Sequence, residues 1–234
     1  QERFEEMGVT VLRDYAKFKD PKTVVVGNNE ITARRIVLAT GSRAKIPNIK
    51  GLDKVNYLTN ESLFDLRKSP RHLAIIGGGP IGVEMAQAHA RLGVKTTIIE
   101  INRIMQGYER RFVEPVHKSL IDDGVNILEG TVVDRVENDR SNIKLHLSSA
   151  SALVVSDLLI AAGRAPNIEK LALTEAGIKY NELGVIVDRN LQTTNRSVYA
   201  IGDIVDGPSF THTASYHAGI VLKKTLFGLS STIQ

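Results

Sequence analysis

The sequence predicts an α/β protein with a parallel sheet, and three observations support this. A short apolar run at residues 73–76 leads into a glycine-rich stretch at 77–82, and a helical pattern follows at 83–92. A strand rich in β-branched residues comes next, at 94–99. A further helix and strand repeat the alternation within residues 110–128. Strands that alternate with helices of this length are typical of parallel sheets covered by helices.

The glycine-rich stretch has the spacing of a dinucleotide-binding loop. Gly77, Gly79 and Gly82 form a GxGxxG pattern between a strand and a helix. In this pattern the first glycine permits a tight turn, the second lets the backbone approach a pyrophosphate, and the third lets the helix pack against the strand. Pro80 and Ile81 lie between the second and third glycines and belong to the same predicted site. We therefore expect a diphosphate there, held by free N–H groups and the positive end of the helix dipole.

Glu100 ends the second predicted strand and lies 18 residues after Gly82. In dinucleotide-binding units, an acid about 20 residues after the glycines hydrogen-bonds the adenine ribose hydroxyls. A carboxylate here repels the 2′-phosphate of NADP, and Arg103 is the only cation between Glu100 and Arg110. We therefore expect NAD to be preferred over NADP. The alternative interpretation is a glycine-rich turn from strand to helix with an incidental acid.

The composition is that of a soluble globular protein of one or two domains, with 234 residues of which 42% are hydrophobic. No apolar run approaches the ~20 residues that span a bilayer, and the first residues do not resemble a secretory signal, so we expect a cytoplasmic protein. The net charge of +4 arises from basic residues interleaved with acids. The densest basic cluster, at 109–111 with Lys118, is interpreted as a solvated helix face rather than a nucleic-acid site.

The chain contains no cysteine. It therefore holds no disulfide, no thiolate nucleophile and no cysteine-ligated metal. Its six histidines never pair with an acid at metal-ligand spacing on one face, so we expect no metal site.

The remaining chain is predicted as strands, turns and one terminal helix. Before the glycine-rich stretch we expect strands at 9–12 and 23–26, a turn at 27–29, a buried strand at 36–40, a capped helical turn at 60–66 and a boundary at Pro70. After residue 128 we expect a β-meander of strands at 132–137, 143–147 and 152–161, a break at 163–167, strands at 184–188 and 197–201, and a helix at 211–227 capped by Thr211 or Thr213.

Four separated motifs occur in one order, at residues 39–42, 77–84, 162–167 and 199–203. This order resembles the flavoprotein disulfide reductase family, also called pyridine nucleotide-disulfide oxidoreductases. Within the family, the sequence at 58–62 and around the glycines looks most like the mercuric reductase and dihydrolipoamide dehydrogenase branch. The resemblance covers nearly the whole chain.

The resemblance implies a Rossmann-like, doubly wound NAD-binding domain with a β-meander, inserted between two segments of an FAD-binding domain. Residues 1–66 would then form the tail of the first FAD-domain segment. Residues 67–165 would form the NAD(P)H-binding domain, and residues 166–234 the returning FAD-domain segment.

The resemblance also implies contacts with FAD. The backbone of Ala16 matches the adenine contact, and Thr40 and Gly41 match the residues that pass the FAD diphosphate and cross into the NAD domain. Gly202 and Asp203 match the segment whose carboxylate hydrogen-bonds the ribityl chain of the flavin. Taken by itself, Asp203 also fits an ordinary turn aspartate.

Further matched positions surround the reacting rings. Thr213 and Ala214 lie at the start of the terminal helix, which matches a dipole aimed at the flavin C2 carbonyl. Glu84 matches a catalytic acid near the nicotinamide that usually pairs with a lysine beside the flavin N5; alternatively it is a solvated first-turn acid favoured by the helix dipole. Gly163 matches a backbone contact on the nicotinamide side, and Arg164 a residue at the domain junction.

Other parts of the family pattern are expected outside this sequence. The first FAD-binding glycine motif and the redox-active cysteine pair would precede Gln1, and the dimerisation domain with its His-Glu couple would follow Gln234. Asp14 stands where the family more often has glycine. We therefore expect a segment of a larger enzyme whose full-length parent is a homodimer.

Three functions remain open at this point. The leading hypothesis is an oxidoreductase that passes hydride from NADH to FAD and electrons onward to a disulfide or thiol-bound metal acceptor. The second is a non-catalytic NADH-binding module, which the absence of cysteine favours. The third is a flavin NADH dehydrogenase that works without redox cysteines.

Overall fold

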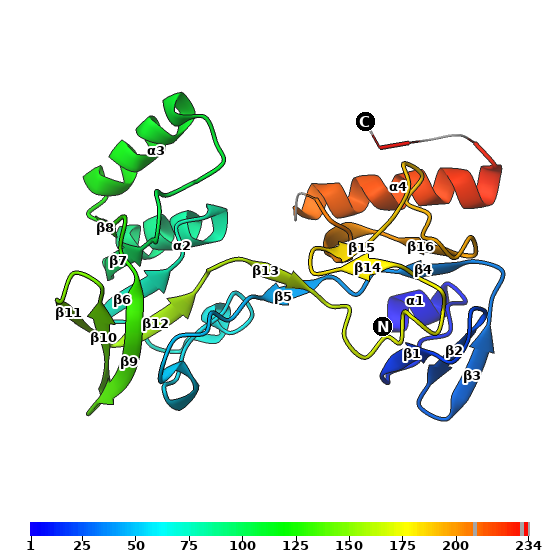
Figure 1. Cartoon of the computed structure of the whole chain (residues 1–234), viewed down its shortest axis with the longest axis horizontal. Coiled ribbons are helices and arrows are strands. Elements are labelled where there is room, and N and C mark those ends of the chain that lie inside the picture. Colours follow the sequence, from blue (N-terminus) through cyan, green and yellow to red (C-terminus); the bar gives the residue numbers. More distant parts are fainter. Residues whose placement is uncertain (208–209, 230–231, 234) are drawn as a thin grey trace. The chain divides into compact units, whose positions relative to one another are not determined.

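The computed structural model describes residues 1–207, 210–229 and 232–233, and the chain divides into two compact units (Figure 1). Unit 1 combines Gln1–Arg43 with Ala165–Gln234, and unit 2 is Ala44–Arg164. Unit 2 is thus inserted between two segments of unit 1. The chain passes between them through β5 (Ser42–Ala44) and β13 (Arg164–Pro166), which pair as a two-stranded ladder.

Unit 2 is built on a parallel sheet of four strands in the order β12-β6-β7-β8. These are β6 (His72–Ile76), β7 (Lys95–Ile99), β8 (Asn126–Leu128) and β12 (Asp157–Ile160). All five residues of β6 are buried, as its apolar run predicts for a strand covered on both faces. The predicted α/β fold with parallel strands is confirmed.

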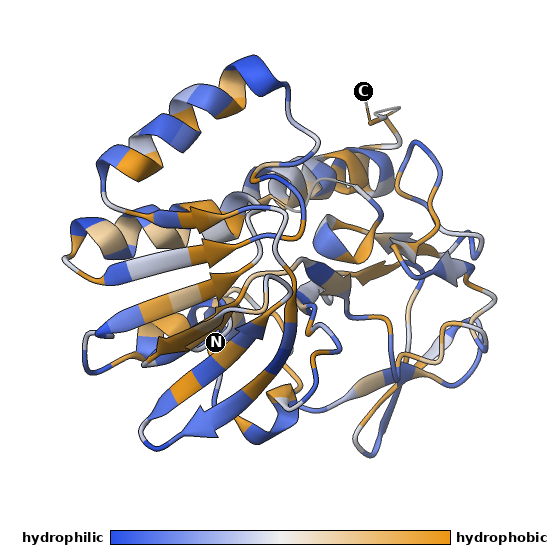
Figure 2. Ribbon diagram, turned by 60° about the vertical axis from the view of Figure 1, so that its left-hand side comes forward, coloured by the Kyte–Doolittle hydropathy of each residue, from blue (hydrophilic) through white to orange (hydrophobic). Residues whose placement is uncertain are grey.

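Different layers cover the two faces of this sheet. On one face α2 (Pro80–Arg91) and α3 (Arg110–Asp122) contribute Val83, Ala86 and Leu120 to a core with Ile75. On the other face lies the antiparallel meander of β9 (Val133–Asp139), β10 (Asn142–Leu147) and β11 (Ala152–Val155), which packs against its own core (Figure 2). The hydropathy colouring follows this arrangement, with apolar residues concentrated along the strands of the sheet.

One strand of the predicted meander is wrong in its extent. Residues 152–161 are not continuous: β11 ends at Val155, and β12 leaves the meander to pair in parallel with β6. Ser156 lies at the joint, where its hydroxyl oxygen accepts hydrogen bonds from the backbone N–H groups of Arg71 (3.0 Å) and His72 (3.1 Å). These bonds tie the chain to the start of β6 and redirect it from one sheet to the other.

The predicted division after residue 66 falls inside unit 2. The short 3₁₀ helices η1 (Leu52–Lys54) and η2 (Leu63–Asp65) each bury one leucine in a core of unit 2, Leu52 on the meander side and Leu63 on the helix side. Residues 44–66 therefore belong to unit 2 by packing, because their apolar side chains have their partners there.

Unit 1 contains small sheets and one long helix. β1 (Ala16–Phe18), β2 (Thr23–Val26) and β3 (Asn29–Thr32) form an antiparallel sheet, and β4 (Ile36–Leu38) pairs in parallel with β16 (Val198–Ala200). The other elements are α1 (Glu2–Glu6), β14 (Tyr180–Asn181), β15 (Gly184–Val185), η3 (Gly202–Ile204) and α4 (Thr211–Phe227). Ile220 and Val221 of α4 pack on Tyr199 of β16.

Four expectations for unit 1 are wrong. Residues 9–12 form no strand, and Val9 and Leu12 are 48% and 42% exposed because this segment has no sheet to join. Of the strand expected at 36–40, only Leu38 within β4 is buried. The strand at 184–188 is reduced to β15. Neither predicted threonine caps α4, because its N-cap residue is Phe210 and makes no side-chain capping bond.

Candidate dinucleotide-binding site

The first and third glycines of the loop after β6 are required by the packing of the backbone around them. Gly77 has φ +114°, and a Cβ atom there would overlap the carbonyl group of Ala161. A Cβ atom on Gly82 would overlap the carbonyl oxygen of Gly77. The start of α2 therefore packs directly on the turn that leaves β6, as expected for the tight turn and the close helix of a dinucleotide-binding loop.

Gly79 differs from these two glycines because nothing in the protein needs it. Its φ of −73° suits any residue, and a Cβ atom there would meet no atom within 4 Å. Gly79 is the N-cap of α2, which has no side-chain cap, and Pro80 at N1 has no N–H. The N–H groups of Ile81 and Gly82 lack intrahelical acceptors by helix geometry. An open backbone beside a helix N-terminus is the arrangement that fits a dinucleotide diphosphate.

Gly78, the unassigned residue between the first two glycines, is more constrained than its place in the pattern suggests. Its N–H donates to Glu100 Oε2 (2.6 Å), and its carbonyl accepts from the N–H of Met105 (2.7 Å). A Cβ atom would lie 2.8 Å from Ile104 Cγ2. The only signal in the sequence was the unbroken run of three glycines, which the pattern alone does not require.

Glu100 is held at the carboxyl end of β7 by two backbone donors. Besides Gly78, the N–H of Asn102 donates to its other oxygen, Oε1 (2.9 Å). Hydrogen bonds to an ionised carboxylate are stronger than neutral ones, and each oxygen keeps a further lone pair for another donor. The negative charge therefore has a fixed place beside the glycine loop, where it can accept hydroxyl hydrogen bonds.

The other predicted residues of unit 2 lie on exposed or half-buried backbone. Glu84 is exposed and is the fifth residue of α2, so it is not in the first turn. Gly163 has φ +117°, and its carbonyl accepts from the N–H of Lys45 (2.9 Å). Arg164 is half-buried, engaged with other groups, and begins β13.

In unit 1, Asn167 links two of the four sequence motifs. Its side-chain Nδ2 donates to the carbonyl of Thr40 (2.9 Å), and its backbone N–H donates to the carbonyl of Gly41 (2.9 Å). Thr40 Oγ1 donates to the carbonyl of Asn167 in return (2.9 Å). Ala16 lies apart from this cluster, at the exposed start of β1 opposite Val26.

Asp203 lies in η3, three residues after the end of β16. Ser42 Oγ donates to its Oδ2 (2.7 Å), although the two residues are 161 positions apart. Gly202, at φ +68°, packs against α4, since its Cβ would lie 3.2 Å from that of Ala214. Thr213 lies in the same turn of α4 and is half-buried. The structure thus brings Ser42, Gly202, Asp203 and the start of α4 together within unit 1.

His217 supports this arrangement, although no sequence motif pointed to this role. It is buried in α4, and its Nδ1 accepts a hydrogen bond from the N–H of Gly202 (3.2 Å). Burial lowers the pKa of His217, which favours the neutral ring that this acceptor role needs.

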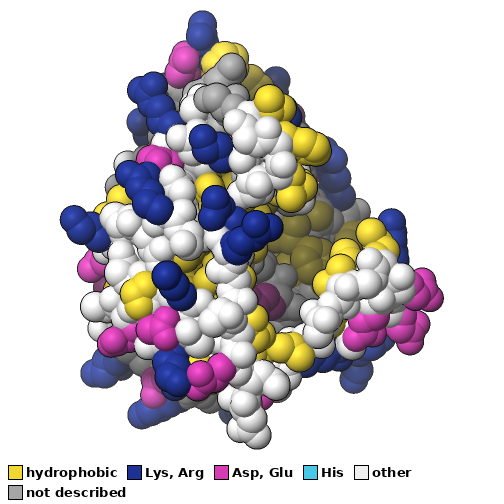
Figure 3. Space-filling view, turned by 90° about the vertical axis from the view of Figure 1, so that its right-hand side faces the viewer, with side chains coloured by type: hydrophobic (Ala, Val, Ile, Leu, Met, Phe, Trp, Pro, Cys, Tyr) yellow, Lys and Arg dark blue, Asp and Glu magenta, His cyan; other side chains and the backbone are white. Residues whose placement is uncertain are grey.

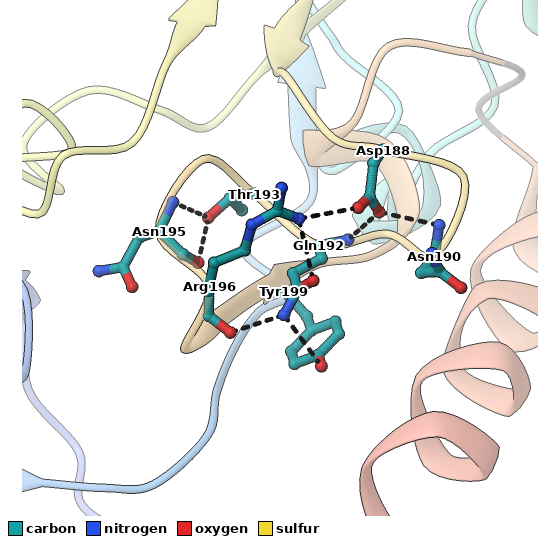
Figure 4. Close-up of polar contacts among 7 residues, drawn as sticks. All are labelled: Asp188, Asn190, Gln192, Thr193, Asn195, Arg196 and Tyr199. Atoms are coloured by element: carbon teal, nitrogen blue, oxygen red, sulfur yellow. Dashed lines mark hydrogen bonds and ion pairs between the residues drawn. The ribbon is translucent and has the colours of Figure 1, made fainter. Parts of the chain in front are cut away.

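The loop before β16 is organised by its own polar side chains (Figure 4). Asp188 Oδ1 accepts from the backbone N–H groups of Asn190 (2.9 Å) and Gln192 (3.1 Å), and Asp188 Oδ2 pairs with Arg196 Nη1 (3.1 Å). Gln192 Nε2 donates to the carbonyl of Arg196 (2.6 Å). These bonds fix the entry into β16 and hence the position of Gly202 and Asp203 at its far end.

Two arginines of the basic cluster at 109–111 make local ion pairs. In the cluster expected to be a solvated face, Arg110 pairs with Glu114 (2.8 Å) and Arg111 with Glu109 (2.8 Å). On the face drawn in Figure 3, Lys and Arg side chains are interspersed with Asp and Glu. Within the described ranges, no cluster of three or more His, Cys, Asp or Glu is suited to a metal ion, and no helix is long and apolar enough to cross a membrane.

The parallel sheet, the glycine loop and the helices that cover one face give unit 2 a fold of Rossmann type. Residues 1–218 match the family model described as pyridine nucleotide-disulphide oxidoreductase, and the chain belongs to this family.

Relatives and solved structures agree with this assignment. The chain is 36% identical to a mercuric reductase of Bacillus cereus, over 98% of this chain and 37% of that protein. It is 32% identical to a dihydrolipoyl dehydrogenase of Geobacillus stearothermophilus, over 96% of this chain and 49% of that protein. The Cu(II) complex of the HOCl-induced flavoprotein disulfide reductase RclA from Escherichia coli superposes with a TM-score of 0.91 and 30% identity, over 99% of this chain and 54% of that one. The chain therefore spans about half or less of the length of these relatives.

Proposed function

We propose that this chain is the nucleotide-binding portion of an FAD-dependent NAD(P)H oxidoreductase, with NADH bound at the glycine loop of α2. The observation that carries the proposal is the difference between the glycines. Gly77 and Gly82 are needed to pack the protein, whereas Gly79 faces open space at a helix N-terminus. A side chain at Gly79 would cost the fold nothing, so its absence is best explained by a ligand that approaches the backbone.

Preference for NADH rests on Glu100. Its carboxylate is fixed by Gly78 and Asn102, so it cannot swing away from a 2′-phosphate without breaking two charge-assisted hydrogen bonds. Each carboxylate oxygen of Glu100 keeps one lone pair free, and these free lone pairs suit the two ribose hydroxyls of NADH. The proposed preference for NADH over NADPH thus follows from the fixed position of the Glu100 carboxylate.

The chemistry of the whole enzyme is hydride transfer between the two cofactors, and these supply it when bound. The residues of this chain would bind and orient them. Glu84 would set the electrostatic field near the nicotinamide, since it is a charged side chain on the exposed face of α2. Gly163 would contribute a backbone contact on the same side, and Arg164 would stand at the domain junction.

The flavin would be held by residues of unit 1. Asp203, oriented by Ser42, would accept a hydrogen bond from the ribityl chain. Thr40 and Gly41, tied together by Asn167, would line the diphosphate, and Ala16 would contact the adenine through its backbone. The α4 residues Thr213 and Ala214 would face the C2 carbonyl.

We further propose that electrons pass from the flavin to a disulfide or thiol-bound metal acceptor, in a homodimeric parent in the cytoplasm. The names of the relatives support this class of acceptor. A second candidate is a flavin NADH dehydrogenase without redox cysteines, because such enzymes share the dinucleotide-binding pattern of Gly77, Gly79 and Gly82.

Titration of the chain with NADH and NADPH tests the dinucleotide proposal. We expect NADH to bind more tightly, and Glu100→Arg to narrow or reverse the difference, because a hydrogen bond to a charged group contributes about 1.5–3 kcal/mol. Asp134→Arg is the matched control, since it makes the same change of charge on the exposed surface of the meander. Equal affinities for the two nucleotides in the unmodified chain would contradict the role of Glu100.

A further inference from the structure

Unit 2 contains a cleft of about 400 Å³ that no part of the proposed dinucleotide site uses. It lies between the segment after β7 and the first turns of α3. The lining residues are Arg103, Ile104, Met105, Gln106, Gly107, Tyr108, Arg110, Val113, Glu114, His117, Lys118 and Glu129. Its size is within the range of small-molecule sites in proteins.

The inner wall of the cleft is apolar. Ile104 is 2% exposed and lies in the core, and Met105 and Val113 are half-buried against that core. α3 carries both apolar and polar residues along its length (Figure 2), and only its Leu120 is fully buried. Its first turns therefore cover the core incompletely. A ligand in the cleft would therefore complete apolar packing that the protein leaves open.

The rim of the cleft has an excess of positive charge. Arg110 is paired with Glu114, and Glu129 accepts a hydrogen bond from the N–H of Ile104 (2.8 Å). Arg103 and Lys118 make no ion pair with any residue that the structure describes. Two cations above an apolar wall attract an anion that carries an apolar body.

We propose that this cleft binds a compact anionic amphiphile, such as an aromatic or short-chain acyl carboxylate. The apolar body packs on Ile104, Met105 and Val113, and the carboxylate lies between Arg103 and Lys118.

Two residues that line the cleft contact the glycine loop. Ile104 Cγ2 lies against the position of a Cβ on Gly78, and the N–H of Met105 donates to the Gly78 carbonyl. Gly78 in turn orients Glu100. A ligand that moves Ile104 or Met105 therefore changes the dinucleotide affinity, and by linkage NADH changes the affinity for that ligand by the same factor. This coupling rests on the proposed NADH site, whereas binding in the cleft does not.

Binding is tested with 2-naphthoate and the isotopically labelled full chain, by following backbone amide signals in solution NMR. We expect saturable shifts at the lining residues of α3 and of the segment 103–108. Val113→Trp, which fills the cleft, should abolish them. The double variant Arg103→Met, Lys118→Met should weaken binding about tenfold, the effect of roughly 1.4 kcal/mol.

Arg111→Met is the matched control, because Arg111 is the neighbouring cation on α3, pairs with Glu109 and does not line the cleft. It should leave the naphthoate affinity unchanged. Non-saturable shifts, or equal losses in Arg111→Met and in the double variant, would overturn the proposal.

Titration of NADH with and without saturating 2-naphthoate separates the two proposals. We expect both molecules to bind together and to change each other's dissociation constant by an equal factor. Complete mutual exclusion would overturn a separate site and make the cleft part of the dinucleotide site, and an unchanged NADH affinity would overturn the coupling. A chain that binds naphthoate in the cleft but no NADH would contradict the proposed function and leave the cleft site standing.

Discussion

The two units hold their candidate nucleotide contacts in different ways. In unit 2 the glycine loop and Glu100 follow adjacent strands, β6 and β7, of a sheet buried on both faces. In unit 1, Thr40 and Asp203 follow the two strands of the short ladder β4–β16 and are fixed by side-chain bonds to residues 127 and 161 positions away. The candidate site of unit 2 is therefore encoded by local sequence and lies on a buried sheet. In unit 1, by contrast, the orientation of Thr40 and Asp203 depends on polar contacts with residues distant in the sequence.

The largest expected effect is in unit 2. Gly79→Val should abolish nucleotide binding without unfolding the protein, because the new side chain meets no protein atom and would occupy the space proposed for the diphosphate. Gly79→Ala should weaken binding less, and Gly82→Val should unfold unit 2, because its Cβ overlaps the Gly77 carbonyl. NADH titration combined with circular dichroism checks all three variants. A folded Gly79→Val protein that binds NADH normally would place the diphosphate elsewhere.

The second prediction concerns unit 1. The purified chain should be colourless and should lack NADH-dependent dye or disulfide reduction, while a full-length parent should be yellow and active. Unit 1 contains no GxGxxG sequence, so FAD would lack its main anion-binding element there. A visible absorption spectrum is sufficient. A stoichiometric flavin band would show that unit 1 binds FAD with the residues present here.

Acid should destabilise both units. Burial lowers the pKa of His72 in unit 2, with a contribution from Lys95, and burial lowers that of His217 in unit 1. Because the unfolded chain binds these protons more readily, stability is fully present above the unfolded pKa near 6.5 and is lost as the pH falls from there through the lowered folded pKa. Each histidine contributes a slope of at most about 1.4 kcal/mol per pH unit.

Urea unfolding at a series of pH values measures this slope. His217→Asn should flatten this pH dependence for unit 1 alone, because the variant has no titratable ring at this position. Its amide oxygen can replace Nδ1 as the acceptor for the N–H of Gly202. His72→Asn should act on unit 2 alone. Stability that stays constant across this pH window would be incompatible with the two buried neutral rings.

The smallest effect is expected at Asn167. Asn167→Ala removes the side-chain hydrogen bonds to Thr40 and from the exposed Arg43 but keeps the backbone bond to Gly41, so unit 1 should lose about 1 kcal/mol. Amide hydrogen exchange should increase around residues 40–42 and stay unchanged in unit 2. An equal rise of amide exchange in both units would show that the Asn167–Thr40 hydrogen bond does not stabilise unit 1 specifically.

The sequence predicted the features that arise from local patterns. The strand and helix around the glycine loop, the second strand before Glu100 and the helix Thr211–Phe227 were found because periodicity and glycine spacing are properties of adjacent residues. The roles of Gly78 and His217 were not predicted, because they depend on Ile104 and Gly202, which only the fold brings near. The joint at Ser156 was missed for the same reason, since its partners lie at the start of β6. The nucleotide contacts themselves stay predictions.

Unit 2 begins and ends at neighbouring points, since the N–H of Lys45 donates to the carbonyl of Gly163 at 2.9 Å. A domain whose two ends lie together can be excised or exchanged without stretching its host. Residues 44–164 are therefore suited to expression as a separate domain, and a single graft at these two positions would transfer the proposed coenzyme preference to a related reductase. The insertion divides unit 1 into two segments, but it leaves unit 2 as one continuous segment that can be transferred as a whole.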